Sequence, residues 1–263
     1  MRPEPSPATA GRPALLVLDT AAEAAAHVGR LVADALVVAP DAVLGLATGA
    51  TMVPVYDWLL AARRDGLLSF ARATSFNLDE YAGLGAAHPG SFAATMRRVL
   101  FDAADFAPDR THLPDGAAAD ADGEAARYEA AIRDAGGIGL QLLGIGRNGH
   151  IGFNEPGSAF DTATRVVTLA ESTRTANGPG FPARQAVPRQ AITMGIATIL
   201  RARRIVLLAT GSTKAQAVAR AWSGVPGPDC PASALQGHPG AVFVCDREAA
   251  GGIVNREQGG IGR

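Results

Sequence analysis

Residues 144–157, with the sequence GIGRNGHIGFNEPG, hold the side chains best suited to acid–base chemistry. The imidazole of His150 titrates near neutral pH, and the carboxylate of Glu155 is close enough in sequence to orient it. Glycines on both sides leave His150 little local packing, which favours a chemical over a structural role. Since neither side chain has a His or Cys neighbour, we predict an acid–base pair and no metal site.

The segment SFNLDEY provides two adjacent carboxylates, Asp79 and Glu80, after an apolar segment. Successive side chains at the end of a strand point to opposite sides. We therefore expect one carboxylate to act on a ligand while the other supports it. A helix N-cap or a pair of solvated acids is the alternative that these residues leave open.

Two short turns, each before a predicted helix, are candidates for binding an anion. The second spans residues 210–214 and ends at Lys214, the only lysine of the chain; the first consists of Thr48, Gly49, Ala50 and Thr51. Hydroxyls and the free N–H groups of a helix N-terminus suit a phosphate. Neither turn has the spacing of a P-loop, so we infer no nucleotide. Ordinary helix capping remains the alternative for each turn.

The elements that must position these residues follow a strand–helix rhythm. Strands are predicted within residues 14–20, 41–51, 71–80, 138–146, 203–210 and 240–246, and helices within residues 21–38, 52–66, 91–102, 121–137, 191–202 and 214–224. An irregular stretch separates the fourth strand from residue 190. Strand segments such as LQLLGIG are continuously apolar, as in parallel strands covered on both faces. This predicts an α/β fold with a doubly wound, mostly parallel, Rossmann-like sheet, with ligands at the carboxyl ends of its strands.

Composition limits the classes of function. The chain has 263 residues, a net charge of -1 and no long basic cluster, which argues against nucleic acid as a partner. No apolar run has the length of a membrane span or the character of a signal peptide, so we expect a cytoplasmic protein. Residues 1–12 read as a disordered tail before one catalytic domain over residues 13–263. We interpret Cys230 and Cys245 as ordinary buried thiols.

At these residues the chain resembles the glucosamine-6-phosphate deaminases, also called glucosamine-6-phosphate isomerases. The resemblance extends from about residue 13 to residue 246 and includes LGLATGAT, FNLDEY, HPGSF, LLGIGRNGHIGFNEPG, STRTAN and GSTKAQAV. GHIGFNEPG is the discriminating segment, because the 6-phosphogluconolactonases share the fold and the early glycine loops but differ after GH.

The resemblance implies conversion of D-glucosamine 6-phosphate and water to D-fructose 6-phosphate and ammonia, in N-acetylglucosamine catabolism, without a metal or an organic cofactor. It implies that Asp79 moves a proton between C2 and C1 and that His150 opens the pyranose ring. Asn148 and Glu155 would orient His150. Some members carry Asp at the position of Asn148, so His150 should rely more on Glu155 to favour its cation.

The chain departs from the family pattern after Asn177, in a segment (about residues 160–187) that acts as a lid in the family. Pro179 stands where members often have an Arg that binds the 6-phosphate, and proline offers neither a charge nor an N–H. We expect the phosphate to bind the Thr48–Thr51 turn and Lys214, with Arg184 or Arg174 as substitutes. Val167 stands near a basic residue of the allosteric members, so activation by N-acetylglucosamine 6-phosphate is not expected.

Other functions stay open from the sequence. One is a related enzyme with altered phosphate recognition, acting on another sugar phosphate or on an unphosphorylated amino sugar. A 6-phosphogluconolactonase-like hydrolase and a non-catalytic sugar-phosphate sensor are further alternatives. The expected partner is a small amino-sugar phosphate, with neither nucleic acid nor membrane, and the sequence leaves a homo-oligomer open.

Overall fold

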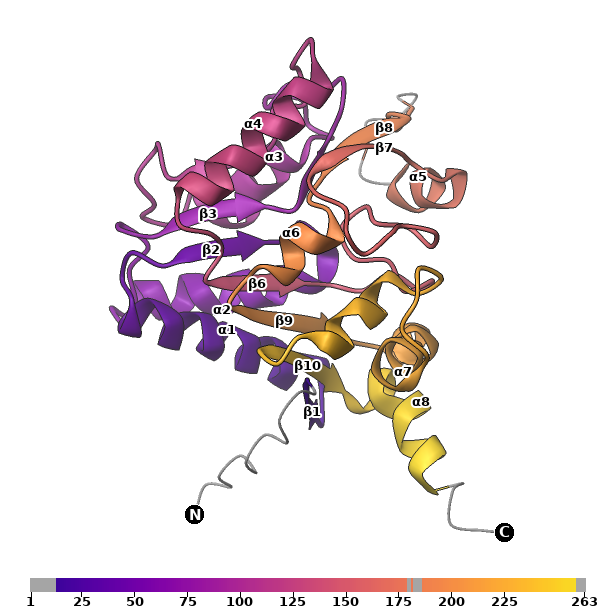
Figure 1. Ribbon diagram of the computed structural model, residues 1–263. Coiled ribbons are helices and arrows are strands. Elements are labelled where there is room, and N and C mark those ends of the chain that lie inside the picture. Colours follow the sequence, from indigo (N-terminus) through magenta and orange to yellow (C-terminus); the bar gives the residue numbers. More distant parts are fainter. Residues whose placement is uncertain (1–12, 179–180, 182–185, 259–263) are drawn as a thin grey trace.

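The computed structural model describes residues 13–178, 181 and 186–258, and its largest feature is a parallel sheet (Figure 1). This sheet has seven strands in the order β1-β10-β9-β6-β2-β3-β5, and every neighbouring pair is parallel. In chain order its strands are β1 (Ala14–Leu18), β2 (Val43–Leu46), β3 (Thr74–Asn77), β5 (Thr111–His112), β6 (Leu140–Leu143), β9 (Arg204–Ala209) and β10 (Ala241–Asp246).

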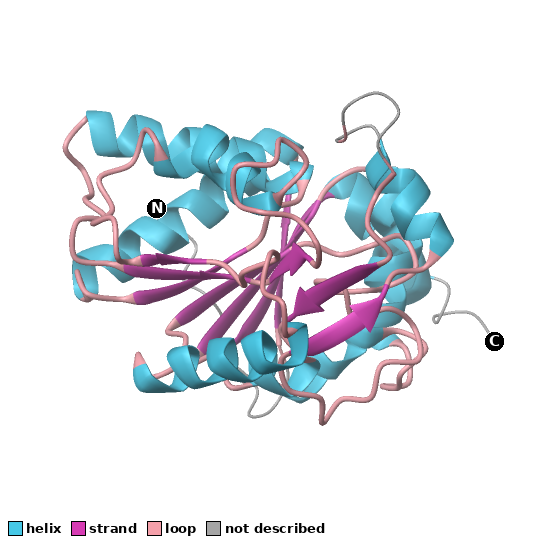
Figure 2. Ribbon diagram, turned by 90° about the horizontal axis from the view of Figure 1, so that it is seen from above, coloured by secondary structure: helices cyan, strands magenta, loops and turns pink. Residues whose placement is uncertain are grey.

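Helices cover both faces of the sheet, as the view along it shows (Figure 2). They are α1 (Ala21–Val38), α2 (Val53–Arg64), α3 (Phe92–Met96), α4 (Ala121–Asp134), α5 (Glu171–Asn177), α6 (Ile196–Leu200), α7 (Ala215–Ser223) and α8 (Arg247–Gln258). The predicted α/β fold with a mostly parallel sheet is confirmed. The last helix, α8, had no counterpart among the predicted elements.

Local sequence explains where the main elements begin and which are central. Helix α1 begins after Thr20, whose hydroxyl accepts the N–H of Glu23 while the Glu23 carboxylate accepts the N–H of Thr20. This reciprocal capping box satisfies two N–H groups that the helix itself cannot. All four residues of β6 are buried, as its continuous apolar run predicts for a strand covered on both faces.

The order of the strands places a topological switch point between β2 and β6. From β2 the chain moves outward through β3 to β5, whereas from β6 it moves the other way through β9 to β10. At such a switch point the loops that leave two neighbouring strands diverge, and ligands of open α/β sheets bind in the crevice between them. The strands end toward the side where α5 and α7 lie (Figure 1). The two loops that flank the switch point begin after Leu46 and Leu143.

A second, antiparallel sheet corrects two of the sequence predictions. It has three strands in the order β4-β8-β7: β4 (Asp79–Tyr81), β8 (Gln190–Thr193) and β7 (Arg165–Thr168). Residues 191–202 were predicted as one helix, but the first of them pair with β4 and β7, and the helix α6 begins only at Ile196. The stretch before residue 190, predicted to be irregular, contains β7 and α5. Pairing with distant strands outweighs local propensity here.

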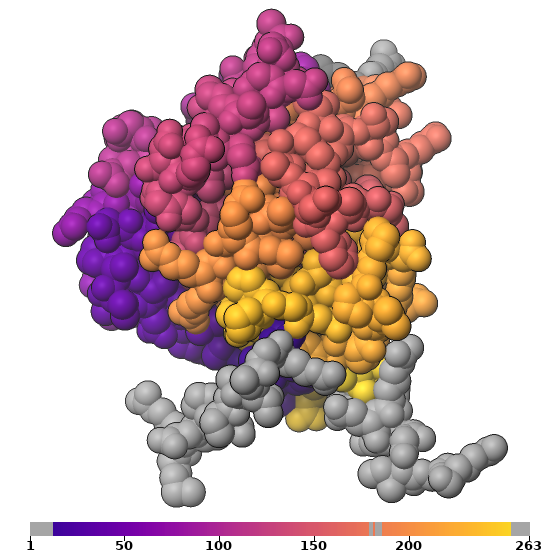
Figure 3. All heavy atoms as spheres, in the orientation of Figure 1, coloured from indigo at the N-terminus to yellow at the C-terminus, as the bar shows by residue number. Residues whose placement is uncertain are grey.

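The small sheet packs directly against α4, as the space-filling view shows for the magenta and orange segments (Figure 3). Glu129 of α4 accepts hydrogen bonds from the N–H of Thr164, just before β7, and from the hydroxyl of Thr198 in α6. The tail at residues 1–12 and the predictions for Pro179 and Arg184 lie outside the described residues. Residues 165–168 and 171–177 of the predicted lid are regular structure, and its role as a lid stays a prediction.

Candidate active site

The carboxylate of Asp79 faces the loop that carries His150. Asp79 is the first residue of β4 and pairs with Thr193 of β8. A Cβ built on Gly152 would lie 3.3 Å from Oδ2 of Asp79 and 3.1 Å from the Thr193 hydroxyl, and Gly152 has a φ of +56°. Glycine therefore allows both this backbone conformation and the close approach of the loop to the carboxylate. The fold thus brings Asp79 to the loop that carries His150, which is far from Asp79 in sequence.

Burial gives Asp79 an unusual acidity. The side chain is only 6% exposed. Burial raises the pKa of Asp79 to about 8 and the Glu80 carboxylate adds to the rise, whereas hydrogen bonds from the Thr193 hydroxyl and the Phe153 N–H lower it. A carboxyl with a pKa near 8 both takes and returns a proton readily near neutral pH, as a proton carrier between two carbon atoms must.

Glu80 points away from Asp79 and supports the structure instead. Its carboxylate accepts hydrogen bonds from the N–H groups of Tyr81 at 2.8 Å, Phe92 at 2.9 Å and Ala93 at 2.8 Å. Phe92 and Ala93 open α3, so Glu80 satisfies two N–H groups that the helix leaves free. Burial raises the pKa of Glu80, and the three N–H donors oppose the rise. The expectation that one carboxylate acts while the other supports agrees with this geometry.

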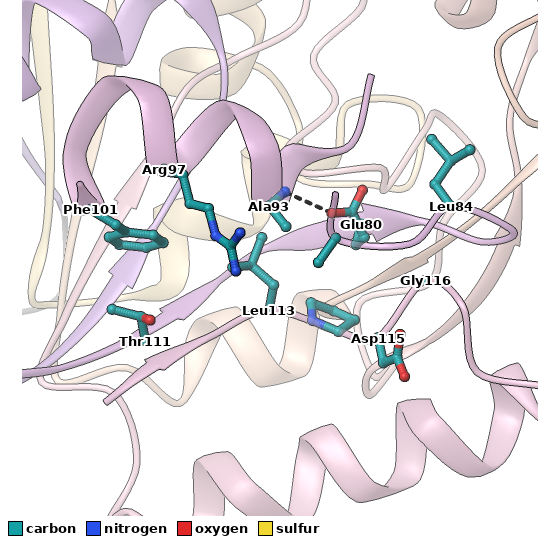
Figure 4. A pocket seen from close by; sticks show the side chains of 11 residues that line it. Glu80, Leu84, Ala93, Arg97, Phe101, Thr111, Leu113, Asp115 and Gly116 are labelled. Carbon is teal, nitrogen blue, oxygen red and sulfur yellow. Dashed lines mark hydrogen bonds between the residues drawn. The ribbon is translucent and has the colours of Figure 1, made fainter. Parts of the chain in front are cut away.

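A cavity of about 260 Å³ lies on the Glu80 side of β4. Figure 4 shows Glu80 at its wall, bonded to the N–H of Ala93, with Arg97 and Asp115 among the side chains around it. Its lining includes none of the residues predicted to act on the substrate. We therefore place the candidate active site on the side of Asp79 that faces the His150 loop rather than in this cavity.

His150 is held by Asn148 and Glu155 in one tautomer. The side-chain oxygen of Asn148 accepts a hydrogen bond from the backbone N–H of His150 at 3.2 Å. The side-chain NH₂ group of Asn148 donates to Oε2 of Glu155 at 2.7 Å. These two partners fix the orientation of the amide. The same amide oxygen lies 2.8 Å from Nδ1 of His150, so Nδ1 must carry the proton. Nε2 of the neutral imidazole is consequently the basic atom.

The surroundings of His150 favour its neutral form. Burial lowers the pKa of His150, the Glu155 carboxylate at 3.6 Å from Nδ1 raises it, and the Lys214 ammonium lowers it. A Cβ on Gly146 would lie 2.2 Å from the imidazole, so the ring lies directly over this glycine. The glycines that flank His150 are thus needed for its position. A neutral imidazole is ready to accept a proton from a sugar hydroxyl.

The first glycine–threonine turn lies at the N-terminus of a helix, as predicted. Gly49 precedes a short 3₁₀ turn at Ala50–Met52 that continues into α2. Gly49 is exposed, with open space around its Cα, and the Thr48 hydroxyl accepts a hydrogen bond from Asn77 at 3.3 Å. This turn flanks the switch point between β2 and β6. Its position and its helix N-terminus suit it to a phosphate group.

The second turn contributes a side chain rather than backbone donors. Carboxylates already occupy its first two N–H groups: Asp246 accepts the N–H of Gly211 at 2.9 Å, and Glu248 accepts that of Ser212 at 3.1 Å. These two N–H groups, of Gly211 and Ser212, are therefore not available to an anion, and the capping alternative holds for them. Lys214 remains a candidate, because its ammonium reaches across to the carbonyl of Ile145 at 2.6 Å, in the loop that carries His150.

Sequence reasoning missed two further residues of the site. The charge of Arg147 adds to burial in lowering the pKa of Lys214, so two cations lie near each other at this loop. Arg147 is exposed in the glycine-rich loop, and a basic side chain at this position could have indicated an anion-binding residue from the sequence. Thr173 of α5 donates a hydrogen bond to Oε1 of Glu155. Nε of Arg174, which was named as a possible substitute at the phosphate, donates to the Val187 carbonyl at 3.1 Å.

Over the described ranges, the chain has no cluster of three or more His, Cys, Asp or Glu side chains with the arrangement of a metal site. Cys230 and Cys245 are both buried and unbridged, as predicted. No helix in the described part combines the length and the apolar character that a membrane crossing requires.

Comparison with known proteins agrees with this geometry. The chain is 52% identical over 227 residues to a glucosamine-6-phosphate deaminase of Rhodopirellula baltica, covering 86% of this chain and 90% of the relative. It is 48% identical over 243 residues to the glucosamine-6-phosphate deaminase of Shewanella loihica, covering 92% of this chain and 91% of the relative.

Solved structures show the same relationship. A monomeric glucosamine-6-phosphate deaminase matches with a TM-score of 0.88 and 45% identity, over 91% of this chain and 99% of the other. The 6-phosphogluconolactonase of Trypanosoma cruzi matches with a TM-score of 0.76 at 19% identity, over 94% of this chain and 98% of the other, which shows a shared fold. Residues 18–244 match the family described as glucosamine-6-phosphate isomerases/6-phosphogluconolactonase, and the chain belongs to that family.

Proposed function

We propose that this chain is a glucosamine-6-phosphate deaminase, which converts D-glucosamine 6-phosphate and water to D-fructose 6-phosphate and ammonia. The observation that carries the proposal is the pair of proton carriers, Asp79 and His150, on facing segments of one site. The relatives at 45–52% identity are glucosamine-6-phosphate deaminases and support the deaminase over the lactonase activity.

The first chemical step that this site supports is opening of the sugar ring. Nε2 of His150 takes the proton of the anomeric hydroxyl, the bond between C1 and the ring oxygen breaks, and the imidazolium returns that proton to the ring oxygen. Since Nδ1 already donates to Asn148, only Nε2 is free for this transfer. Glu155, held beside Nδ1, stabilises the imidazolium that forms in passing.

The second step moves a proton along the open chain. The Asp79 carboxylate removes the proton at C2, next to the aldehyde, and returns it to C1. A second proton passes from the amino group to the oxygen on C1, and the product is the 2-imine of the ketose. Water adds to this imine and ammonia leaves. Proton removal next to a carbonyl requires only a carboxylate held at contact distance, and the buried Asp79 provides one in its ionised form.

We further propose that the 6-phosphate binds the turn of Thr48, Gly49, Ala50 and Thr51 together with Lys214. The exposed N–H groups at the N-terminus of the helix and the ammonium are complementary to a dianion. Arg147 supplies a second positive charge close to Lys214. It is therefore our candidate to replace the arginine that is missing at the position of Pro179.

The decisive experiment is a steady-state assay of ammonia and fructose 6-phosphate with glucosamine 6-phosphate as substrate. Glucosamine and 6-phosphogluconolactone are tested in parallel. We expect turnover of the phosphorylated amino sugar and little turnover of either alternative. Preferred turnover of glucosamine would contradict the phosphate assignment, lactone hydrolysis would indicate the other branch of the family, and binding without turnover would indicate a sensor.

A further inference from the structure

Helix α5 contacts the two halves of the candidate site through residues on one of its faces. Thr173 donates its hydroxyl proton to Oε1 of Glu155, and Asn177 donates to the Tyr81 hydroxyl at 2.9 Å. Residues four apart on a helix lie on the same face. Tyr81 is the last residue of β4, the strand that begins with Asp79. The inner face of α5 is thus bonded to both the His150 loop and the Asp79 strand.

The contact of Thr173 with Glu155 completes a chain of hydrogen bonds that ends at the imidazole. Oε1 of Glu155 accepts from Thr173 and Oε2 accepts from Asn148 at 2.7 Å. The oxygen of the same Asn148 side chain accepts the Nδ1 proton of His150. Every donor in this series of hydrogen bonds has one acceptor, so the orientation of each side chain depends on that of the preceding side chain in the series.

We propose that Thr173 is a positioning residue for His150, acting through Glu155 and Asn148. The proposal rests on the proposed function, because His150 is the ring-opening base in that reaction. Thr173 is only 8% exposed, so water does not readily replace its hydroxyl. Without this donor, Oε1 of Glu155 loses its hydrogen bond from Thr173 and the carboxylate is free to rotate. The side-chain amide of Asn148 then no longer has a fixed acceptor. The Nδ1–H tautomer of His150 then ceases to be enforced.

Three variants separate the hydroxyl from the shape of the side chain. Thr173→Val keeps the volume and removes the hydroxyl, whereas Thr173→Ser keeps the hydroxyl. Thr175→Val is the matched control, since Thr175 is an exposed threonine of the same helix. Thermal denaturation monitors folding, and Thr173→Ala provides a second hydroxyl-free variant if the valine is not accommodated.

The activity readout compares two substrates. We expect Thr173→Val to lower kcat for cyclic glucosamine 6-phosphate about 10-fold, the factor that corresponds to loss of one hydrogen bond to a charged group, with KM nearly unchanged. An analogue without the 5-hydroxyl cannot close the pyranose ring, so its turnover should fall much less. Thr173→Ser should recover most of the loss, and Thr175→Val should match the wild type.

A second readout does not depend on activity, so failure of this inference is distinguishable from failure of the proposed function. Nitrogen-15 chemical shifts of the histidines report the tautomer of His150. We expect a single Nδ1–H tautomer in the wild type and in Thr173→Ser, and a mixture in Thr173→Val. The proposal is overturned if Thr173→Val keeps both the single tautomer and the wild-type kcat, or if Thr173→Ser loses as much as the valine variant.

Discussion

Burial favours the uncharged form of both Asp79 and His150. It raises the pKa of the Asp79 carboxyl to about 8 and lowers the pKa of the His150 imidazole, because the low-dielectric surroundings disfavour the charged form of each. Hydrogen bonds to Asp79 oppose the rise of its pKa, and the Glu155 carboxylate opposes the fall of the pKa of His150. One physical cause thus moves the pKa values of the two residues in opposite directions, as the proposed proton transfers require.

Replacing Asp79 tests the proton transfer between C2 and C1. Asp79→Asn keeps the shape but removes the basic carboxylate, so we expect kcat to fall by about 10²–10⁴-fold, the usual contribution of a general base. Substrate binding, measured by calorimetry, should survive. In the wild type, kcat/KM should rise with pH toward about 8, because the carboxylate must be ionised. Near wild-type ammonia release from the folded variant would remove Asp79 from this role and direct the search to Glu80.

Replacing His150 tests ring opening. His150→Gln should reduce turnover of cyclic glucosamine 6-phosphate more than turnover of the analogue that lacks the 5-hydroxyl, because only the cyclic substrate needs the Nε2 base. The two losses are measured as kcat ratios to the wild type. Equal losses on both substrates would show that His150 positions the substrate instead.

Replacing Lys214 tests recognition of the phosphate. We expect Lys214→Met to raise KM for glucosamine 6-phosphate by about 10–100-fold, the range for loss of a charge-assisted hydrogen bond. Arg147→Ala should raise KM as well if the second cation shares the dianion. Arg184→Ala is the comparison for the position named from the family pattern. An unchanged KM in Lys214→Met, with glucosamine turned over equally well, would refute the 6-phosphate assignment.

Among the elements, α3 and β4 are joined through Glu80. Three backbone N–H groups converge on this buried carboxylate, two of them from the first turn of α3. Glu80 thus joins β4 to the first turn of α3, while the preceding side chain, Asp79, faces the loop that carries His150. The alternation of side chains along a strand explains why the two neighbouring carboxylates have different partners.

Glu80→Ala should destabilise the protein, because it leaves buried N–H groups without acceptors, at a cost of about 1–3 kcal/mol for each such group. Chemical denaturation measures the change in free energy of unfolding. Glu80→Gln is the milder comparison, since an amide oxygen still accepts. Loss of the Glu80 charge should also lower the pKa of Asp79 and move the acid side of the kcat/KM profile to lower pH. Wild-type stability of Glu80→Ala would contradict the capping role.

For the whole molecule, the ionisation of Asp79 links stability to pH. The pKa of Asp79 is raised in the folded protein to about 8 from an ordinary value of 3.8. Between these pH values the folded state retains a proton that the unfolded state has lost, so the contribution of Asp79 to stability is full below pH 4 and falls as pH rises to about 8. The site is thus maintained at a cost in stability that grows with pH.

Asp79→Asn removes this titration, so we expect the variant to become more stable than the wild type, increasingly so as pH rises from 5 to 8. Each unit of pKa difference corresponds to about 1.4 kcal/mol, which thermal denaturation at several pH values readily detects. The control is Asp19→Asn, an exposed aspartate in the loop after β1. A stability difference that is constant over this range would show that Asp79 is not held protonated.

The sequence by itself determined the parallel sheet, most of its strands and helices, and the loops that hold Asp79, Asn148, His150, Glu155 and Lys214. These features are local: apolar runs of strand length, alternating with helical segments, specify a layered sheet, and glycine-rich turns after strands lie at one edge of it. The different surroundings of Asp79 and Glu80 also follow from a local rule, the alternation of side chains along a strand.

Only the tertiary structure decided what depends on distant partners. Residues 191–193 resemble the start of a helix by themselves, but they belong to β8 because β4 and β7 provide hydrogen-bond partners on both sides. The N–H groups of Gly211 and Ser212 resemble an anion site in the sequence, but in the fold the carboxylates of Asp246 and Glu248 accept their hydrogen bonds. The bond of Thr173 to Glu155 is equally non-local. Such contacts join segments that are distant in sequence, and the local residue pattern of one segment does not specify its partner in the other. They can therefore be identified only in the folded chain.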